Sequence, residues 1–277
     1  MLGNFSSRNP LFAQWNPARP LATAITGKLR LGTFRERLEV GAFERPYYAY
    51  CVYHSADLAK KLGYREISMA EYGVAGGNGL VLLEQYAEEV SKEIGIGIQV
   101  YGFDTGAGLP APVDYRDLPY HWKPGFFAMD EARLRERLKN AKLVIGDIRE
   151  TAETFFDQYE PAPLAAVMHD FDFYSSTEVA LTMLEVDEKY RLPRIYCYFD
   201  DIIGDEVELY NDFTGERLAI AEFNERNKTK KFSPAYHLIT RDVPQQWYHQ
   251  IYTLHDFEHR HYNAFVSENN QQLPLES

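Results

Sequence analysis

The feature that most constrains the fold is an alternation of short apolar runs with helical segments between residues 66 and 201. Apolar runs of strand length occupy 66–73, 98–104, 142–147, 164–172 and 194–201. Segments with helical character separate them at 79–95, 130–141, 151–159 and 176–190. This alternation is typical of βαβ units, which place parallel strands in one sheet and helices on both of its faces. We therefore predict an α/β fold.

The flanking segments complete the predicted domain. Residues 46–62 are expected to form a helix that ends at Gly63, because glycine readily adopts the left-handed conformation of a helix C-cap. After a helix at 216–227, the runs 236–240 and 249–257 predict a terminal antiparallel pair. The prediction is therefore seven strands in one mostly parallel sheet with an antiparallel C-terminal strand. Residues 1–45 are expected to be an N-terminal arm or lid, 46–264 the domain, and 265–277 a flexible tail.

Charge and composition disfavour several partners. The chain carries 41 acidic and 29 basic residues, and its formal net charge of −12 repels nucleic acid phosphates. Lys228, Lys230 and Lys231 are interpreted as solvated charge in a loop. The two cysteines lie inside apolar runs and favour free thiols in a reducing compartment. No signal-peptide pattern and no membrane-spanning run is present, so we predict a cytoplasmic protein that binds neither nucleic acid nor membrane.

The ends of the predicted strands carry the residues with chemistry. Ligands of open α/β sheets bind outside the carboxyl ends of the strands. Here those ends are rich in acids and glycines: 71–79 (EYGVAGGNG), Asp104, 146–147 (GD), 169–172 (HDFD) and 200–201 (DD). These positions are the candidates for a binding and catalytic site.

The glycine-rich loop favours a nucleoside ligand without a pyrophosphate. Its spacing departs from the Gly-x-Gly-x-x-Gly pattern of dinucleotide-binding loops, which disfavours NAD. Asp104, at the end of the second run, is placed to accept hydrogen bonds from ribose hydroxyls. Glu71 precedes the first glycine of the loop by two residues, and a cationic amino-acid ligand such as S-adenosylmethionine tolerates such a carboxylate.

Three acids from two strand ends predict a metal site. Asp170, Asp200 and Asp201 are expected to converge, and clustered carboxylates repel one another unless a cation or protons neutralise them. Mg²⁺ prefers such oxygen ligands and is able to hold a substrate hydroxyl and lower its pKa. The alternative is that Asp172, Asp200 and Asp201 cap the turns and helices that follow them.

A general base is harder to assign. His169 adjoins Asp170 and is a candidate catalytic residue, although alternation along a regular strand points its side chain away from that of Asp170. A packed structural histidine is the alternative. His255 and His259 are weaker candidates.

Four stretches together resemble the macrocin O-methyltransferase-like family of class I methyltransferases. They are 71–77 (EYGVAGG), 103–110 (FDTGAGLP), 169–177 (HDFDFYSST) and 199–201 (FDD), and they occur in the order of the family's motifs. The third stretch is the most specific. The loop after Asp201 lacks the tyrosine of the family pattern, which places substrate contacts there in question.

The resemblance implies a Rossmann-like class I methyltransferase fold, S-adenosylmethionine as cofactor and a Mg²⁺ site. By position it implies Glu71, Gly73 and Gly77 at the methionine moiety, Asp104 at the ribose and Asp147 at the adenine edge. It also implies the metal ligands Asp170, Asp200 and Asp201, and it is compatible with a homo-oligomer in which the arm is a contact.

The sequence thus predicts an S-adenosylmethionine-dependent O-methyltransferase that acts, with metal assistance, on a hydroxyl of a sugar-like natural-product small molecule. Asp170 and His169 are its candidate catalytic residues. Three alternatives remain open: a cofactor-binding protein without methyl transfer, an NAD-linked oxidoreductase, and a metal-free methyltransferase acting on another nucleophile.

Overall fold

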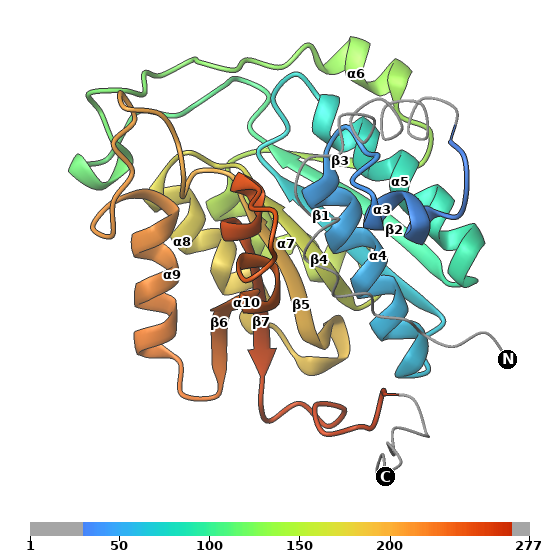
Figure 1. The fold of residues 1–277 in the computed structure, drawn as a ribbon. Coiled ribbons are helices and arrows are strands. Elements are labelled where there is room, and N and C mark those ends of the chain that lie inside the picture. The colour runs from blue at the N-terminus through green and yellow to red at the C-terminus, as the bar shows by residue number, and fades with distance from the viewer. Residues whose placement is uncertain (1–29, 268–277) are drawn as a thin grey trace, which may run out of the picture.

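A single seven-stranded sheet organises the chain in the computed structural model, which describes residues 30–267. The strand order is β3-β2-β1-β4-β5-β7-β6 (Figure 1). The strands are β1 (Glu66–Tyr72), β2 (Gly97–Asp104), β3 (Lys142–Ile145), β4 (Leu164–His169), β5 (Arg191–Phe199), β6 (Lys230–Pro234) and β7 (Ile251–Asp256). Strands β1 to β5 pair in parallel, and β7 is antiparallel to both β5 and β6. This confirms the predicted fold class.

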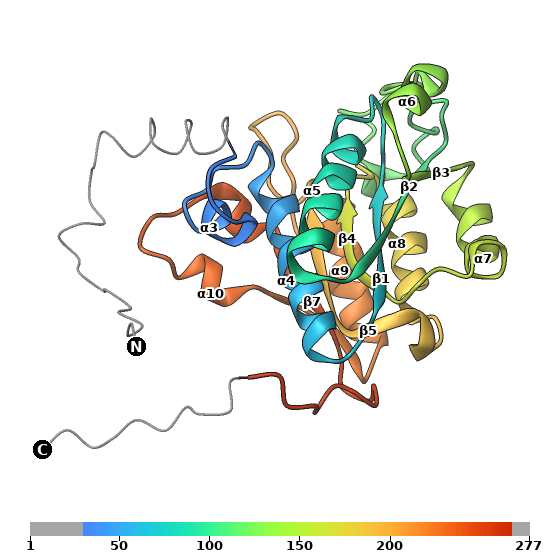
Figure 2. The ribbon, with the colours of Figure 1, turned by 90° about the vertical axis from the view of Figure 1, so that its right-hand side faces the viewer.

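Helices cover both faces of the sheet (Figure 2). The helices of the described residues are α3 (Phe34–Glu39), α4 (Pro46–Lys61), α5 (Asn78–Ile94), α6 (Glu131–Arg137), α7 (Ile148–Tyr159), α8 (Tyr174–Thr182), α9 (Gly215–Arg226) and α10 (Tyr236–Ile239). Helices α4 and α5 pack on one face and bury one apolar cluster. Helices α7, α8 and α9 bury a second cluster on the other face. The two apolar clusters fix the sheet between its helices. The carboxyl ends of the parallel strands therefore lie together at one edge of the sheet.

The predicted ends of two helices are confirmed in detail. Gly63, with a φ of 85°, follows the C-cap of α4, and its N–H donates to the carbonyl of Lys60. The N–H of Tyr64 donates to the carbonyl of Ala59, which completes a Schellman motif. Asp130 caps α6 by accepting a hydrogen bond from the N–H of Arg133. Local sequence therefore determines where these helices stop and start.

The prediction for the sixth strand is wrong. Residues 236–239 form the short helix α10 rather than a strand, and β6 lies at 230–234, where a lysine-bearing loop was expected. An edge strand needs few apolar residues, because only one of its faces is buried. Phe232 supplies that face by packing its ring 5.6 Å from Phe199 and 4.8 Å from Phe223. The apolar run at 236–240 instead buries Leu238 through a single helical turn.

Other boundaries also differ from the prediction. The helix expected over 176–190 ends at Thr182, and two 3₁₀ turns follow it. Part of the predicted arm is regular, since α3 begins with a capping box between Thr33 and Glu36 and buries Phe34 completely. The rest of the arm, 1–29, and residues 268–277 of the predicted tail lie outside the described residues. No helix within 30–267 combines the length and hydropathy that a membrane span requires.

We expect Glu84 to be a major determinant of stability. This α5 side chain is 6% exposed and accepts hydrogen bonds from the backbone N–H groups of Lys139, Asn140 and Ala141. Glu84→Ala should lower the free energy of unfolding by roughly 2–3 kcal/mol, because buried donors lose a charged acceptor. Urea denaturation would measure the change. Glu88→Ala on the same helix is the control, since its exposed ion pairs contribute little. Equal effects of the two variants would contradict the assignment.

Candidate functional site

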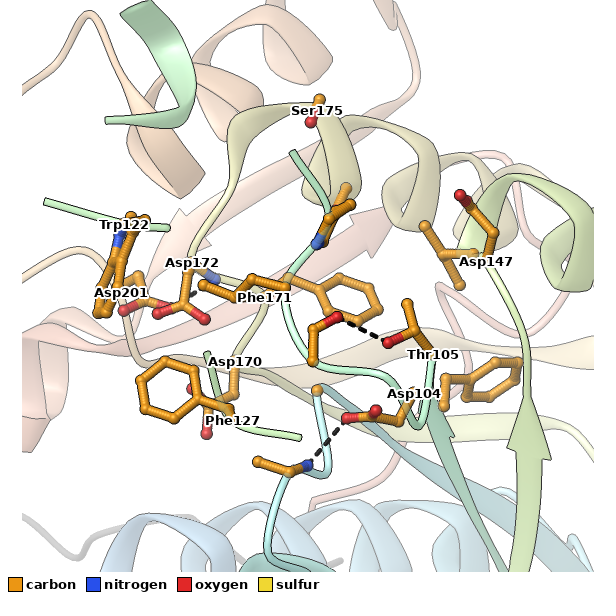
Figure 3. Close-up of a pocket in the computed structure, with 18 of the residues that line it drawn as sticks. Asp104, Thr105, Trp122, Phe127, Asp147, Asp170, Phe171, Asp172, Ser175 and Asp201 are labelled. Atoms are coloured by element: carbon orange, nitrogen blue, oxygen red, sulfur yellow. Dashed lines mark hydrogen bonds between the residues drawn. The ribbon is translucent and has the colours of Figure 1, made fainter. Parts of the chain in front are cut away.

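A cavity of about 400 Å³ opens at the carboxyl ends of the parallel strands. Its size falls within the range of about 300–1,000 Å³ that is common for small-molecule sites. Figure 3 shows two regions in it, with Asp104, Thr105 and Asp147 on one side and Asp170, Asp172 and Asp201 on the other. The predicted edge of the sheet is therefore the edge that carries the cavity.

Asp104 connects the glycine-rich loop to the second strand. Its Oδ2 accepts hydrogen bonds from the N–H groups of Val74 and Ala75 at 2.9 and 2.8 Å, and its Oδ1 accepts one from Gly106 at 2.7 Å. A carboxylate has about four lone-pair positions, so acceptor capacity remains for the hydroxyls of a ligand. Asp104 lines the cavity as well as ordering its wall.

Gly73 also lines the cavity, and its conformation requires glycine. Its φ is 84°, and a Cβ there would lie 1.8 Å from the carbonyl oxygen of Asp170. Gly77 is different. It precedes α5 with a φ of 79°, and a Cβ would lie 2.2 Å from Leu134 of α6. The cavity lining includes Gly73 but not Gly77, so the observed role of Gly77 is the packing of α6 over the loop.

Glu71 is buried beside the cavity without lining it. Its Oε1 accepts a 2.8 Å hydrogen bond from the hydroxyl of Tyr48, whereas its Oε2 is buried and has no hydrogen-bond partner among the described residues. Burial raises the pKa of the Glu71 carboxyl to about 8. An unpartnered buried carboxylate oxygen is costly, and a donor or cation supplied by a ligand would offset that cost.

Asp147 lines the cavity on the same side as Asp104 and Thr105 (Figure 3), and it caps α7. Its carboxylate accepts a 2.9 Å hydrogen bond from the backbone N–H of Arg149 and forms an ion pair with the guanidinium of the same residue. The hydrogen bonds from that guanidinium hold the pKa of Asp147 below its ordinary value. Asp147 therefore stays ionised at the rim of the cavity.

Three carboxylates converge as the sequence predicts. Asp170, Asp200 and Asp201 each offer an oxygen, and these oxygens all lie within 4.8 Å of one another. Burial and the charges of Asp200 and Asp201 raise the pKa of Asp170 well above its ordinary value. Burial and the charge of Asp200 likewise raise the pKa of Asp201 to about 7. Three oxygen donors with unfavourable mutual repulsion suit a hard divalent cation such as Mg²⁺.

Hydrogen bonds hold this cluster in place. The hydroxyl of Tyr198 donates to Asp200, and the hydroxyl of Tyr210 donates to Asp201 at 2.7 Å. Asp201 also accepts a 2.9 Å hydrogen bond from the N–H of Asp172, so it fixes a turn in addition to facing the cavity. Asp172 has a φ of 58° and adds a further carboxylate to the lining.

His169 lies inside the core. It is fully buried, its ring stacks 4.3 Å from that of Phe199, and neither ring nitrogen has a partner among the described residues. Burial lowers the pKa of His169 to about 3. The cavity lining does not include His169, so the structure does not bring it to the site. His255 and His259 are also remote, because β7 pairs His255 with Arg194 near the amino end of β5.

The roof of the cavity was missed by the sequence analysis. Residues 105–130 connect β2 to α6 and place Leu109, Trp122 and Phe127 over the site. Asp117, only 1% exposed, anchors this segment by accepting hydrogen bonds from the N–H of Val113 and from the N–H and hydroxyl of Ser175. Ser175 lies in the first turn of α8, so one carboxylate joins the roof to the helix after β4.

A second loop completes the roof. Residues 202–214 contribute Glu208 to the cavity lining. The hydroxyl of Tyr120 donates a 2.6 Å hydrogen bond to the carbonyl of Glu208, which joins the two roof segments. Tyr210 joins the second segment to the acid cluster through Asp201. The sequence carries no periodic signal for these contacts, because they link residues far apart in irregular segments.

Comparison with known proteins shows the fold. No protein-family model and no curated protein sequence matches the chain. The solved structure of the O-methyltransferase NovP is similar with a TM-score of 0.51 and 16% sequence identity, over 86% of this chain and 98% of that one. The calicheamicin methyltransferase CalS11 gives a TM-score of 0.48 and 17% identity, over 86% of this chain and 91% of that one. With its strand order, the chain has the class I, Rossmann-like methyltransferase fold.

The buried Glu71 predicts a specific pH dependence. Its pKa is raised from 4.5 to about 8, so between these pH values the unfolded chain releases a proton that the folded protein retains. The contribution of Glu71 to stability therefore falls as pH rises through this window. The glutamine of Glu71→Gln does not ionise. The free energy of unfolding of this variant, relative to that of the wild type, should therefore increase by about 3–5 kcal/mol between pH 4.5 and about pH 8. Denaturant titrations across this range would measure the difference, and a difference independent of pH would contradict the prediction.

Proposed function

We propose that the protein is an S-adenosylmethionine-dependent O-methyltransferase that acts with Mg²⁺ on a hydroxyl of a small, sugar-like molecule. The observation that carries the proposal is the meeting of two features in one cavity. The wall formed by Gly73 and Asp104 suits a nucleoside, and the Asp170–Asp200–Asp201 cluster suits a divalent cation. An electrophile and an activated hydroxyl would therefore be held side by side.

The proposed cofactor contacts lie on the side of the cavity that carries Asp104 and Gly73. We assign Asp104 to the ribose hydroxyls and Asp147 to the adenine edge, because both are carboxylates at the nucleoside side. Gly73 would let the backbone approach the ligand closely, since it carries no side chain. Glu71 would receive the cationic amino group, because its Oε2 is buried without a partner. Gly77 would act only indirectly, by shaping the loop.

The chemistry requires orientation and charge stabilisation rather than a covalent intermediate. When bound, S-adenosylmethionine supplies an electrophilic methyl group, and Mg²⁺ lowers the pKa of an oxygen ligand. Asp170, Asp200 and Asp201 would hold the cation and position the acceptor hydroxyl. The hydroxyl proton needs an acceptor within the cavity, and Asp172 is the lining carboxylate that stands next to the cluster. His169 has no part in this proposal.

The acceptor class rests on the chemistry of the roof. Trp122 and Phe127 lie over the acid side of the cavity and offer apolar ring faces (Figure 3). Glu208 and Asp172 add hydrogen-bond acceptors there. Aromatic faces next to carboxylates suit a ring that carries several hydroxyls. A cytoplasmic location and a homo-oligomeric state are further expectations from the sequence.

The first experiment is calorimetric titration with S-adenosylmethionine and S-adenosylhomocysteine, with and without Mg²⁺. We expect binding of both ligands, followed by methylated products detected by mass spectrometry in a panel of sugar-bearing acceptors. No binding under either condition would overturn the proposal. Binding without any methylated product would favour the cofactor-binding alternative, and methyl transfer unaffected by a chelator would favour the metal-free one. A titration with NAD tests the oxidoreductase alternative.

A further inference from the structure

Arg45 is a cation surrounded by acidic groups but paired with none of them. It directly precedes α4 and is partly buried, with its guanidinium carbon 5.1 Å from the centroid of the Tyr48 ring. Within residues 30–267, its guanidinium forms no ion pair at 4.0 Å or less. A partly buried guanidinium has five N–H donors to satisfy, so the arrangement leaves room for an anionic partner.

The electrostatic surroundings locate Arg45 at the site. Burial lowers the pKa of Arg45, but Tyr48, Tyr47, Glu71 and Asp170 outweigh burial and raise that pKa above its ordinary value. Asp170 lines the cavity, and Glu71 lies two residues before Gly73, which also lines it. Arg45 does not itself line the cavity. Its contact with the ring of Tyr48, whose hydroxyl donates to Glu71, places it beside the start of the glycine-rich loop, where the methionine end of the cofactor is expected.

The N-terminus of α4 adds to the positive electrostatic potential around Arg45. The helix has 16 residues, and the side chain of Arg45 makes no capping hydrogen bond to it. The first N–H groups of a helix carry a partial positive charge and favour anions. Two contacts fix the orientation of this helix end: Tyr48 donates to Glu71, and the ring of Tyr47 stacks 4.2 Å from that of Tyr198. Tyr198 in turn donates to Asp200 of the acid cluster.

An unpartnered cation and an unpartnered carboxylate oxygen thus both adjoin Tyr48, beside the cavity and outside its lining. Glu71 is 1% exposed, and its Oε2 has no hydrogen-bond partner among the described residues. A ligand group that carries both charges, an α-ammonium and an α-carboxylate, complements this pair. We propose that Arg45 binds the α-carboxylate of an amino-acid-bearing nucleoside whose ammonium group faces Glu71. This inference rests on the proposed function and adds the residue that selects the amino-acid end of the ligand.

The test compares nucleoside ligands with and without the α-carboxylate; S-adenosylmethionine and its decarboxylated form differ by that group alone. S-adenosylhomocysteine, S-adenosylmethionine, decarboxylated S-adenosylmethionine and 5′-methylthioadenosine would be titrated into the wild type and into Arg45→Gln by calorimetry. We expect Arg45→Gln to weaken the two carboxylate-bearing ligands by about 10- to 100-fold, as the loss of a charged hydrogen bond does. The affinities for the two ligands without a carboxylate should change less than about twofold. Arg35→Gln, at an exposed ion pair of α3, is the control for the loss of one positive charge.

The outcomes separate this inference from the function on which it rests. No binding of any of the four ligands to the wild type would overturn the proposed function. Wild-type binding with an equal loss for all four ligands in Arg45→Gln would overturn the inference alone, since Arg45 would then serve only to neutralise nearby acids. If Arg45→Gln does not fold, the wild type still decides, because equal affinity for S-adenosylmethionine and its decarboxylated form would contradict a carboxylate contact.

Discussion

Asp200→Asn is expected to abolish most turnover while leaving cofactor binding nearly intact. Asp200 belongs to the three-carboxylate cluster, whose oxygens lie within 4.8 Å of one another. Figure 3 shows its partners Asp170 and Asp201 on the side of the cavity away from Asp147. The substitution keeps the size of the side chain and removes one negative charge from the cluster. Because catalysis of this kind depends on preorganised charge, we expect turnover to fall by about 100-fold or more. Affinity for S-adenosylhomocysteine should change less than about threefold, since the altered charge lies outside the nucleoside contacts.

Three measurements make this prediction decisive. Calorimetry measures S-adenosylhomocysteine binding, mass spectrometry measures the methylated product, and a Mn²⁺ titration followed by electron paramagnetic resonance measures metal affinity. Asp212→Asn is the matched control, because Asp212 is exposed, pairs with Arg217 and does not line the cavity. Equal loss of cofactor affinity and turnover in Asp200→Asn would contradict the division of the cavity into two functional sides. Unchanged Mn²⁺ affinity would remove Asp200 from the metal site.

Asp117→Ala is expected to have the second largest effect, by releasing the roof. The Asp117 carboxylate accepts hydrogen bonds from Val113 and Ser175, and it joins residues 105–130 to α8 beside the stacking of Arg116 on the ring of Tyr174. Removing it leaves three donors without their acceptor at a site that is almost fully buried. We expect the free energy of unfolding to fall by roughly 2–4 kcal/mol. The Michaelis constant for the acceptor should also rise, because Trp122 and Phe127 lie on the released segment.

The control for Asp117 lies in the same segment. Asp114 caps the 3₁₀ turn Tyr115–Asp117 and pairs with Arg116, but its hydrogen bonds are local and do not reach α8. Asp114→Ala should therefore change stability by less than about 1 kcal/mol and leave acceptor affinity unaltered. Thermal unfolding and steady-state kinetics with a saturating cofactor would compare the two variants. Similar behaviour of both would show that the roof does not depend on the anchor.

Some features of the site could be predicted because they follow from local pattern. Short apolar runs between helical segments place the parallel strands, and the acids that follow those strands converge once the strands align in parallel. Asp170, Asp200 and Asp201 therefore meet as the sequence indicates. Successive side chains of a strand point to opposite sides, which accounts for His169. Its side chain lies in the core, while that of Asp170 lines the cavity.

Other features had no local signal. The anchor of the roof joins Asp117 to Ser175 across 58 positions, and no periodic pattern marks either residue. The sixth strand was predicted at the wrong position, because strand β6 at the edge of the sheet buries only Phe232, whereas the neighbouring apolar run buries Leu238 in one helical turn. Propensity and pattern are weak guides where tertiary contacts decide the conformation.

The sequence by itself determined the order of the five parallel strands and the helices between them, the edge of the sheet that carries the site, and the acids that gather there. Only the tertiary structure decided how the cavity is closed, which carboxylate lacks a partner, and where Arg45 stands relative to Glu71. The physical reason is the distance along the chain over which each interaction acts. Backbone periodicity and strand ends act over a few residues, whereas desolvation and charge pairing depend on neighbours that the folded chain brings together from distant segments.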